Sequence, residues 1–181
     1  MKIEYAILGL LSWKPLTGYD IKKIIQESTF MHWSGNNNQI YKALMNLSED
    51  NLVSNHVIHQ EGAPSKKEFS ITEEGLSVLN NWVRTSELEL PEYKKTFLVQ
   101  LSWSESLDTA QILRLLEKYQ SKIEEELAFH TETKRREKNF PNRNDREQFI
   151  WEMLCDNMIS SYENEIIWVT KFRKELEQWK K

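Results

Sequence analysis

The sequence has 181 residues, 39% of them hydrophobic, which is enough to bury a core in one or two domains. The net charge is −4, with eight basic and nine acidic residues in 1–85 and 16 basic and 19 acidic residues in 86–181. Because an acidic protein repels phosphate at long range, any nucleic-acid binding must come from a local basic patch. The single cysteine excludes an intramolecular disulfide and a cysteine-based zinc site within one chain. No apolar run approaches the roughly 18 residues of a membrane span, so we expect a cytoplasmic protein with no membrane partner.

Two short helices are predicted near the N-terminus. In the first, apolar residues recur at the spacing of one helix face, at Ile3, Ala6, Ile7, Leu10 and Leu11. Lys14-Pro15 ends that helix because proline cannot continue it. Thr17 is then a good N-cap with Asp20 three residues later, a variant of the capping box. The second helix buries the face that carries Ile21, Ile24 and Ile25.

A third helix is predicted over residues 33–50, and its outer face suits the base edges of DNA. Its core face consists of Ile40, Leu44 and Leu47. Side-chain amides bond bidentately to adenine in the major groove, and a lysine beside them can pair with phosphate or guanine. The polar residues that fall largely on other sides are Asn37, Asn38, Gln39, Tyr41 and Lys42. The competing interpretation is that Ser, Gly and Asn simply start a helix. Two short helices before this third one are typical of a helix-turn-helix.

A β-hairpin is predicted after the third helix. Residues 52–59 and 66–71 are rich in β-branched and aromatic residues at alternating positions, and residues 60–65 have the composition of a turn. Thr72 then caps a helix that runs through Val83. Lys66 and Lys67 lie near the tip of this two-stranded wing, where they would meet the DNA backbone. The alternative is that they are ordinary surface lysines.

Four separated blocks of sequence resemble PadR-type transcriptional regulators. They are Ala6-Ile7-Leu8-Gly9-Leu10-Leu11, Leu16-Thr17-Gly18-Tyr19-Asp20-Ile21, Gln39-Ile40-Tyr41-Lys42-Ala43-Leu44 and Lys66-Lys67-Glu68-Phe69-Ser70-Ile71-Thr72-Glu73-Glu74-Gly75. The resemblance covers about residues 3–83, and the remainder looks like the helical C-terminal domain of the longer members. The Trp33-Ser34 and Gln39-Ile40-Tyr41 segments look closest to the phenolic-acid-responsive branch. The chain departs from many relatives at Lys42, where they carry proline, and in the wing, where they carry arginine.

The resemblance implies a homodimeric repressor with a winged helix on each subunit, released from double-stranded operator DNA by a small molecule. The expected fold class is mainly α with a small two-stranded β wing. We expect a winged helix-turn-helix domain over 1–84 and a helical dimerisation and effector domain over 85–181. The expected DNA-binding residues are Tyr19, Asn36, Asn37, Asn38, Gln39, Tyr41, Lys42, Lys66 and Lys67.

Three further helices are predicted in the C-terminal half. Pro91 starts the first, with Tyr93, Phe97, Leu98 and Leu101 on one side. Asp108, with Gln111 at its third position, caps a long second helix that ends near Lys138. The segment 139–144 breaks the pattern, and Asn144 with Glu147 starts the last helix.

The last predicted helix carries a heptad repeat that needs a partner. Its apolar positions alternate four and three residues, with Glu165 as the one charged break, at Trp151, Cys155, Met158, Tyr162, Glu165, Val169, Phe172, Leu176 and Trp179. The partner is the 109–138 helix of the same chain, another subunit, or both. The candidate dimerisation residues are Met158, Tyr162, Val169, Phe172 and Leu176. Cys155 fits a small core residue better than a redox sensor.

The aromatic content suggests an effector site. The chain has seven tryptophans, and aromatic walls with a few polar groups are typical of small-molecule pockets. The candidate effector-binding residues are Trp33, Trp82, Phe97, Trp103 and Trp151. The resemblance favours a small aromatic acid, with a planar cation as the alternative, while the plainer interpretation is that these rings pack an interdomain core.

Neither an enzyme nor a metal protein is expected. The four histidines, His32, His56, His59 and His130, lack metal-binding spacing, and no nucleophile-elbow or P-loop motif is present. We therefore expect no metal and no cofactor. A second hypothesis is a winged-helix adaptor that binds protein, but such an adaptor has no need of outward-facing amides at Asn37, Asn38 and Gln39.

Overall fold

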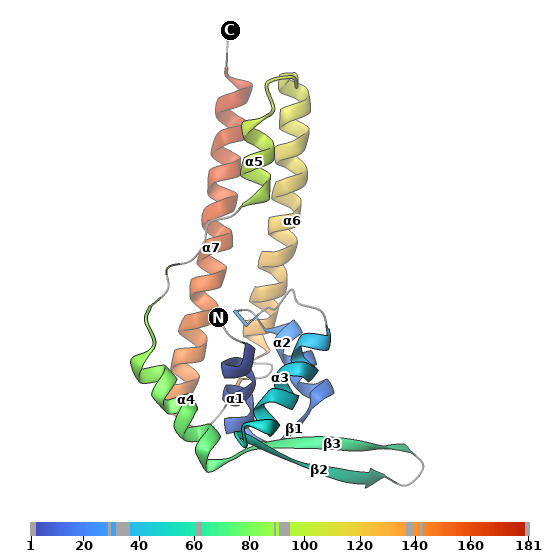
Figure 1. The fold of residues 1–181 in the computed structure, drawn as a ribbon. Helices are drawn as coiled ribbons and strands as arrows, with labels where there is room; N and C mark the ends of the chain where they lie inside the picture. The colour runs from blue at the N-terminus through green and yellow to red at the C-terminus, as the bar shows by residue number, and fades with distance from the viewer. Residues whose placement is uncertain are drawn as a thin grey trace. The chain divides into compact units, whose positions relative to one another are not determined.

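The computed structural model describes residues 3–28, 30–31, 37–60, 63–88, 90, 95–136, 140–141 and 143–179, with only the backbone described at 37, 59, 60, 63 and 64. The chain forms two compact units, Met1–Glu89 and Leu90–Lys181. The predicted boundary after residue 84 falls at the end of α4. The elements in Figure 1 are α1 Ile3–Trp13, β1 Leu16–Thr17, α2 Gly18–Glu27, α3 Asn37–Glu49, β2 Val53–Gln60, β3 Ala63–Ile71, α4 Glu73–Thr85, α5 Thr96–Ser102, α6 Thr109–Arg135 and α7 Asp145–Glu177. The predicted class, mainly helical with a small sheet, is confirmed.

One continuous apolar core holds the first unit together. Each of α1, α2 and α3 turns an apolar face inward, which confirms the predicted helical stripes. The largest fully buried side chains of this core are Ile7, Leu8, Ile21, Ile25 and Leu44. Full burial of an aliphatic side chain contributes about 1.5–3 kcal/mol, so this cluster is the main source of the unit's stability.

Side-chain caps begin the helices at the predicted residues. Thr17 Oγ1 accepts a hydrogen bond from the backbone N of Asp20 at 3.1 Å, and Asp20 Oδ2 accepts one from the backbone N of Thr17 at 3.2 Å. Asp108 and Gln111 form the same reciprocal box at α6. The remaining predicted N-caps are also confirmed, at Thr72 for α4 and Asn144 for α7.

The sheet has three antiparallel strands in the order β1-β3-β2, where the sequence predicted two. The additional strand pairs Leu16 with Phe69 and Thr17 with Glu68. Two residues are too short to show an alternating pattern, so the sequence could not reveal it.

The wing strands are longer than predicted. The expected turn over 60–65 was wrong at Gln60 and from Ala63 onward, because β2 continues to Gln60 and β3 begins at Ala63. Pro64 is tolerated because β1 pairs with β3 only at Phe69 and Glu68, so one side of β3 has no described neighbouring strand at Pro64.

The junction of α3, β2 and α4 is tightly packed. Asn51 adopts a left-handed backbone with φ 58°, a conformation that asparagine tolerates. Thr72 Oγ1 donates to the carbonyl of Asn51 at 2.8 Å and accepts from the backbone N of Gly75 at 3.0 Å. A Cβ on Gly75 would lie 2.1 Å from the carbonyl oxygen of Leu52, so only glycine fits there.

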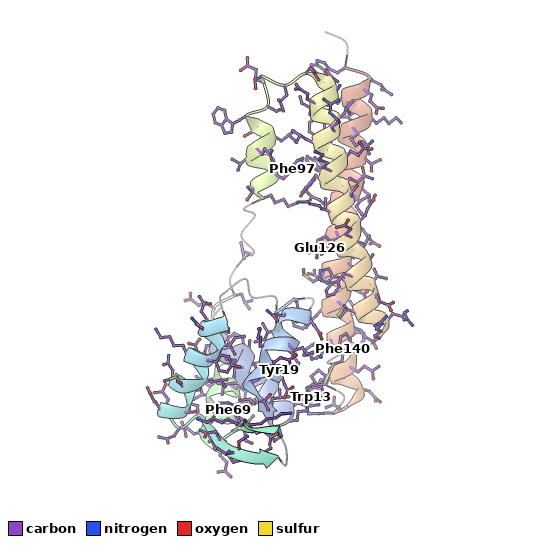
Figure 2. The ribbon with its side chains drawn as sticks, turned by 90° about the vertical axis from the view of Figure 1, so that its right-hand side faces the viewer. Trp13, Tyr19, Phe69, Phe97, Glu126 and Phe140 are labelled. Atoms are coloured by element: carbon purple, nitrogen blue, oxygen red, sulfur yellow. The ribbon has the colours of Figure 1, made fainter. Side chains whose placement is uncertain are left out.

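The second unit consists mainly of α6 and α7, which run antiparallel side by side in both views (Figures 1 and 2). Leu116 and Ile123 of α6 and Cys155 and Val169 of α7 are buried, which supplies the heptads of α7 with an intrachain partner. None of the helices that the structure describes is long and apolar enough to cross a bilayer.

Two predicted helix ends differ from the structure. Lys95 has extended backbone, with φ −91° and ψ 101°, so the described helix α5 begins at Thr96 and not at Pro91, which lies outside the described residues. The helix predicted to end near Lys138 ends at Arg135. At this end of α6, Glu132 forms ion pairs with both Arg135 and Arg136, which the spacing of apolar residues does not predict.

Candidate nucleic-acid interface

The third helix has one buried and one exposed face. Its inner side chains, Ile40, Ala43, Leu44 and Leu47, are buried in the core of the first unit. The candidate DNA-binding residues Asn38, Gln39, Tyr41 and Lys42 are all exposed. Asn36 lies outside the described residues, as does the side chain of Asn37. The helix therefore offers amide, phenol and ammonium groups to a partner while its other side is anchored.

Tyr19 on α2 and Tyr41 on α3 extend this surface. Tyr19 is 64% exposed and Tyr41 48% exposed, although both are large aromatic residues (Tyr19 is labelled in Figure 2). Large aromatic side chains are usually buried, so exposed ones indicate an interaction surface.

Sequence reasoning missed three exposed residues one helical turn further along. Met45 and Asn46 follow Tyr41 and Lys42 by four positions on α3, and Lys23 follows Tyr19 by four on α2. Positions i and i+4 share a helix face, so this spacing was the available signal.

The wing carries the two predicted lysines on an ordered ladder. Lys66 pairs with Ile58 and Lys67 with Val57, and both lysine side chains are exposed. The Nζ of Lys67 lies 5.4 Å from the ring centroid of Phe69, two residues along the same strand face.

Local charge in the first unit differs from that of the whole chain. The exposed face of α2, α3 and the wing carries Lys23, Lys42, Lys66 and Lys67. Of the carboxylates on these elements, Asp20 is engaged with Thr17 and Glu68 with His56 at 3.2 Å, while Glu49 at the end of α3 is exposed. A basic patch of this kind can neutralise phosphates although the chain as a whole is acidic.

The effector candidates are not gathered into one site within the units. Trp82 stacks on Tyr5 in the first unit, with ring centroids 4.5 Å apart, and Trp103 is 82% exposed. Trp33 lies outside the described residues.

The two remaining candidates lie far apart along the second unit. Phe97 points from α5 to Tyr119 of α6, with centroids 3.8 Å apart, while Trp151 contacts Phe140 at 5.5 Å (Figure 2). Lys95, two residues before Phe97, binds Glu165. Trp151 lies fourteen residues before Glu165, or about 21 Å along α7, so the two rings do not share a pocket.

A polar cluster beside α5 contains the charged break in the heptads. Glu165 is bound by the hydroxyl of Tyr119 at 2.8 Å and by the ammonium of Lys95. Burial, together with the hydrogen bond and charge of Glu165, raises the pKa of Tyr119 above its usual range, so this phenol remains a hydrogen-bond donor.

An open cavity lies next to that cluster on the α6–α7 pair. Its volume is about 510 Å³, and its lining residues are Tyr119, Lys122, Ile123, Glu125, Glu126 and Tyr162. The lining residues carry two phenol rings, two carboxylates and one ammonium group, so the wall is aromatic and acidic on balance.

The predicted dimerisation residues divide between intrachain packing and partial exposure. Val169 is fully buried and Tyr162 stacks on His130 of α6 at 5.0 Å, so both pack within the chain. Met158, Phe172 and Leu176 are half-buried. At 100° per residue, the exposed apolar residues on the opposite side of α7 include Phe149, Ile150, Met153 and Ile167.

In the part of the chain that the structure describes, no three His, Cys, Asp or Glu side chains are grouped to hold a metal ion. His56 pairs with Glu68 on the wing, His130 is buried on α6, and Cys155 is buried in the α6–α7 seam. His32 lies outside the described residues.

Comparison with known proteins identifies both halves of the chain. Residues 7–81 match the model of the Transcriptional regulator PadR-like family, and residues 93–177 match a model described as Virulence activator alpha C-term. The Negative transcriptional regulator PadR of Bacillus subtilis (strain 168) is 33% identical over 81 residues, 45% of this chain. The match spans 44% of that relative, which is less than half its length.

Solved structures match over nearly the whole chain. The crystal structure of Bacillus subtilis PadR in complex with operator DNA has a TM-score of 0.82 at 21% identity, covering 96% of this chain and 98% of that chain. The same protein in complex with p-coumaric acid has a TM-score of 0.78 at 21% identity, covering 98% and 99%. At this identity the similarity establishes the fold.

Proposed function

Because residues 7–81 match the model of the Transcriptional regulator PadR-like family, we propose that the chain is a homodimeric, sequence-specific repressor that a small aromatic ligand releases from its operator. The family consists of regulators and not enzymes. The observation that carries the DNA-binding part is α3, whose apolar face is buried while Asn38, Gln39 and Tyr41 are exposed. We also place the protein in the cytoplasm.

Base reading and backbone binding fall to different residues. Asn38 and Gln39 carry amides that can bond adenine edges in the major groove, and Tyr41 lies one turn along from Asn38. Lys42, Lys66 and Lys67 supply charge and reach for phosphate, which positions the protein without reading sequence. The contribution of Asn36 and Asn37 is proposed on the sequence alone.

The exposed side of α7 supports the homodimer. Phe149, Ile150 and Met153 form an apolar strip on the side opposite the α6 contact, and such strips are normally covered by a partner. A second subunit that covers this strip would leave the intrachain seam intact. The half-buried Met158, Phe172 and Leu176 remain candidates elsewhere on α7.

The effector proposal has two chemical versions. The p-coumaric acid complex of Bacillus subtilis PadR supports a small aromatic acid. Because Phe97 and Trp151 do not share a pocket, such a ligand would contact only some of the candidates Trp82, Phe97, Trp103 and Trp151, and Trp33 is proposed on the sequence alone. The cavity lined by Tyr119, Tyr162, Glu125 and Glu126 favours a planar cation. A titration of tryptophan fluorescence with coumaric acid, and a second with a cationic dye, shows which compound binds. A release assay with operator DNA then shows which compound acts as the effector.

A mobility-shift titration against the DNA upstream of its own gene tests the DNA proposal. We expect Lys66→Ala with Lys67→Ala to weaken binding to all duplexes and to flatten the salt dependence by up to about two units per subunit. The matched control is Lys171→Ala with Lys174→Ala on α7, which makes the same change in net charge. Equal effects of the two pairs would exclude the wing from the interface, and no binding by the unaltered protein would refute the proposed function.

Single changes on α3 test base reading. Asn38→Ala or Gln39→Ala should reduce the preference for the upstream duplex over a scrambled duplex and should change the affinity for the scrambled duplex less. The reason is that contacts to base edges carry the sequence specificity. Equal weakening on both duplexes would contradict base reading by that residue.

A further inference from the structure

The ring of Tyr41 occupies the space where a side chain at residue 18 would begin. Gly18 is the buried first residue of α2, and a Cβ placed on it would lie 2.7 Å from Cε1 and 3.4 Å from Cδ1 and Cζ of Tyr41. Carbon atoms in favourable contact are about 3.5–4.0 Å apart. The ring can therefore hold this position only while residue 18 is glycine.

The backbone at Gly18 is fixed from both sides. Immediately before it, β1 is paired with β3 through Leu16 and Thr17, and the Thr17–Asp20 capping box closes around it. Ile21, in the first turn of α2, is fully buried. A new side chain at residue 18 would consequently displace the half-exposed ring of Tyr41, and the backbone of α2 would stay in place.

We infer that Gly18 is a positioning residue that sets where Tyr41 stands on the outer face of α3. The inference rests on the proposed DNA-binding function. Since β1 and β3 are paired, the glycine also ties the position of Tyr41 to the strand that carries Lys66 and Lys67. The missing Cβ thus lets a proposed DNA-binding side chain keep one position relative to the strand that carries the wing lysines.

Three glycines of the first unit give matched substitutions to alanine. A Cβ on Gly9 meets nothing within 4 Å, one on Gly18 meets a movable ring, and one on Gly75 meets the backbone at 2.1 Å. We expect Gly9→Ala to leave DNA binding unchanged and to stabilise α1 slightly, because alanine loses less conformational entropy in a helix interior. Gly75→Ala should destabilise the unit. Gly18→Ala should keep the melting temperature of the unaltered protein and weaken operator binding about fivefold, the worth of one hydrogen bond.

A double-mutant cycle assigns the effect to Tyr41. In a Tyr41→Ala background the ring is gone, so Gly18→Ala should have no further effect on operator binding. An equal loss in both backgrounds would overturn the inference, because the glycine would then act without the ring. Full operator affinity in Gly18→Ala alone would overturn it as well.

Ring resonances of ¹³C-labelled tyrosine in the full chain keep this test separate from the proposed function. The Tyr41 signals, assigned by their loss in Tyr41→Phe, should shift in Gly18→Ala and stay fixed in Gly9→Ala. Unmoved signals in Gly18→Ala would refute the inference even if DNA binds. If the unaltered protein binds no upstream duplex while the Tyr41 signals shift, the proposed function fails and the packing of Tyr41 against Gly18 is supported.

Discussion

The two units bury their apolar residues in different ways. In the first, sixteen buried hydrophobic residues from α1–α4 and the three strands form one cluster. In the second, the buried side chains of the α6–α7 seam include Leu116, Ile123, Cys155 and Val169. The large apolar side chains left exposed there include Phe129, Phe149, Met153 and Ile167. A three-dimensional core closes on itself, whereas a two-helix seam covers only one side of each helix. The first unit therefore closes its own core, whereas the second leaves apolar side chains available to a partner.

The largest expected effect is the loss of a buried leucine in the closed core. Leu44 is 1% exposed and Leu116 0% exposed, so Leu→Ala removes the same buried group from each unit. We expect Leu44→Ala to cost about 3–5 kcal/mol and Leu116→Ala about 2–3 kcal/mol, because a seam relaxes around a cavity more easily than a closed core. Chemical unfolding of the full chain measures both, and a larger cost at Leu116 would reverse the comparison.

The next effect tests whether the second unit needs a partner. Phe149→Glu with Met153→Glu should leave helix content unchanged and convert a dimer to monomer, since burying two unpaired carboxylates at an interface costs several kcal/mol, on the order of a hundredfold or more in Kd. Light scattering across a dilution series measures it. The control, Met45→Glu on α3, should leave the dimer intact. A dimer that survives the double change would place the subunit contact elsewhere.

A smaller effect is expected at the polar cluster of the second unit. Glu165→Gln removes the charge that binds Lys95 but keeps an oxygen for Tyr119, and Glu165→Ala removes both partners. We expect the unfolding free energy to fall by about 1 kcal/mol for the first change and by about 1–2 kcal/mol for the second, because the second leaves the half-buried hydroxyl of Tyr119 without its acceptor. Unfolding curves that coincide for all three proteins would show that the cluster contributes nothing.

The smallest effect is a pH dependence at the start of α7. The hydrogen bond from Arg143 holds the pKa of Glu147 below its ordinary value of 4.5, despite the opposing effect of burial. A lowered pKa in the folded state stabilises the protein above pH 4.5, and this contribution is lost as the pH falls toward the folded value. The melting temperatures of the unaltered protein and Glu147→Gln should therefore converge below pH 4.5, and a constant difference would contradict the assignment.

Local signals made much of the fold predictable. The Thr17–Asp20 and Asp108–Gln111 caps depend on residues three apart, and the apolar faces of α1–α3 follow from spacing alone. The same logic failed at β1, where two residues carry no pattern, and at Lys95, where a nearby proline suggested an earlier helix start. The sequence also could not decide which partner α7 packs against, because heptads specify an apolar face and not its occupant.

The candidate site was predictable in composition but not in geometry. The exposure of Asn38, Gln39 and Lys42 follows from the helical period around Ile40 and Leu44. The approach of Tyr41 to Gly18 does not, since the two residues are 23 positions apart and meet only when α2 packs on α3. The dispersal of the effector candidates in the second unit likewise depends on tertiary contacts, since Phe97 stacks on Tyr119 of α6 while Trp151 contacts Phe140.

The carboxylate of Glu165 also restricts how far α6 and α7 can slide past each other. A shift of one heptad, about 10.5 Å along the axis, would again place apolar residues opposite apolar residues, so the hydrophobic stripe tolerates more than one alignment. Such a shift would move the carboxylate away from Tyr119 on α6 and from Lys95, leaving a negative charge in the seam without its donors. Because an uncompensated buried charge is costly, only one alignment satisfies it. Glu165, the charged residue in the repeat, thus selects the register of α6 against α7. Through Lys95 it also selects the position along this pair at which α5 packs.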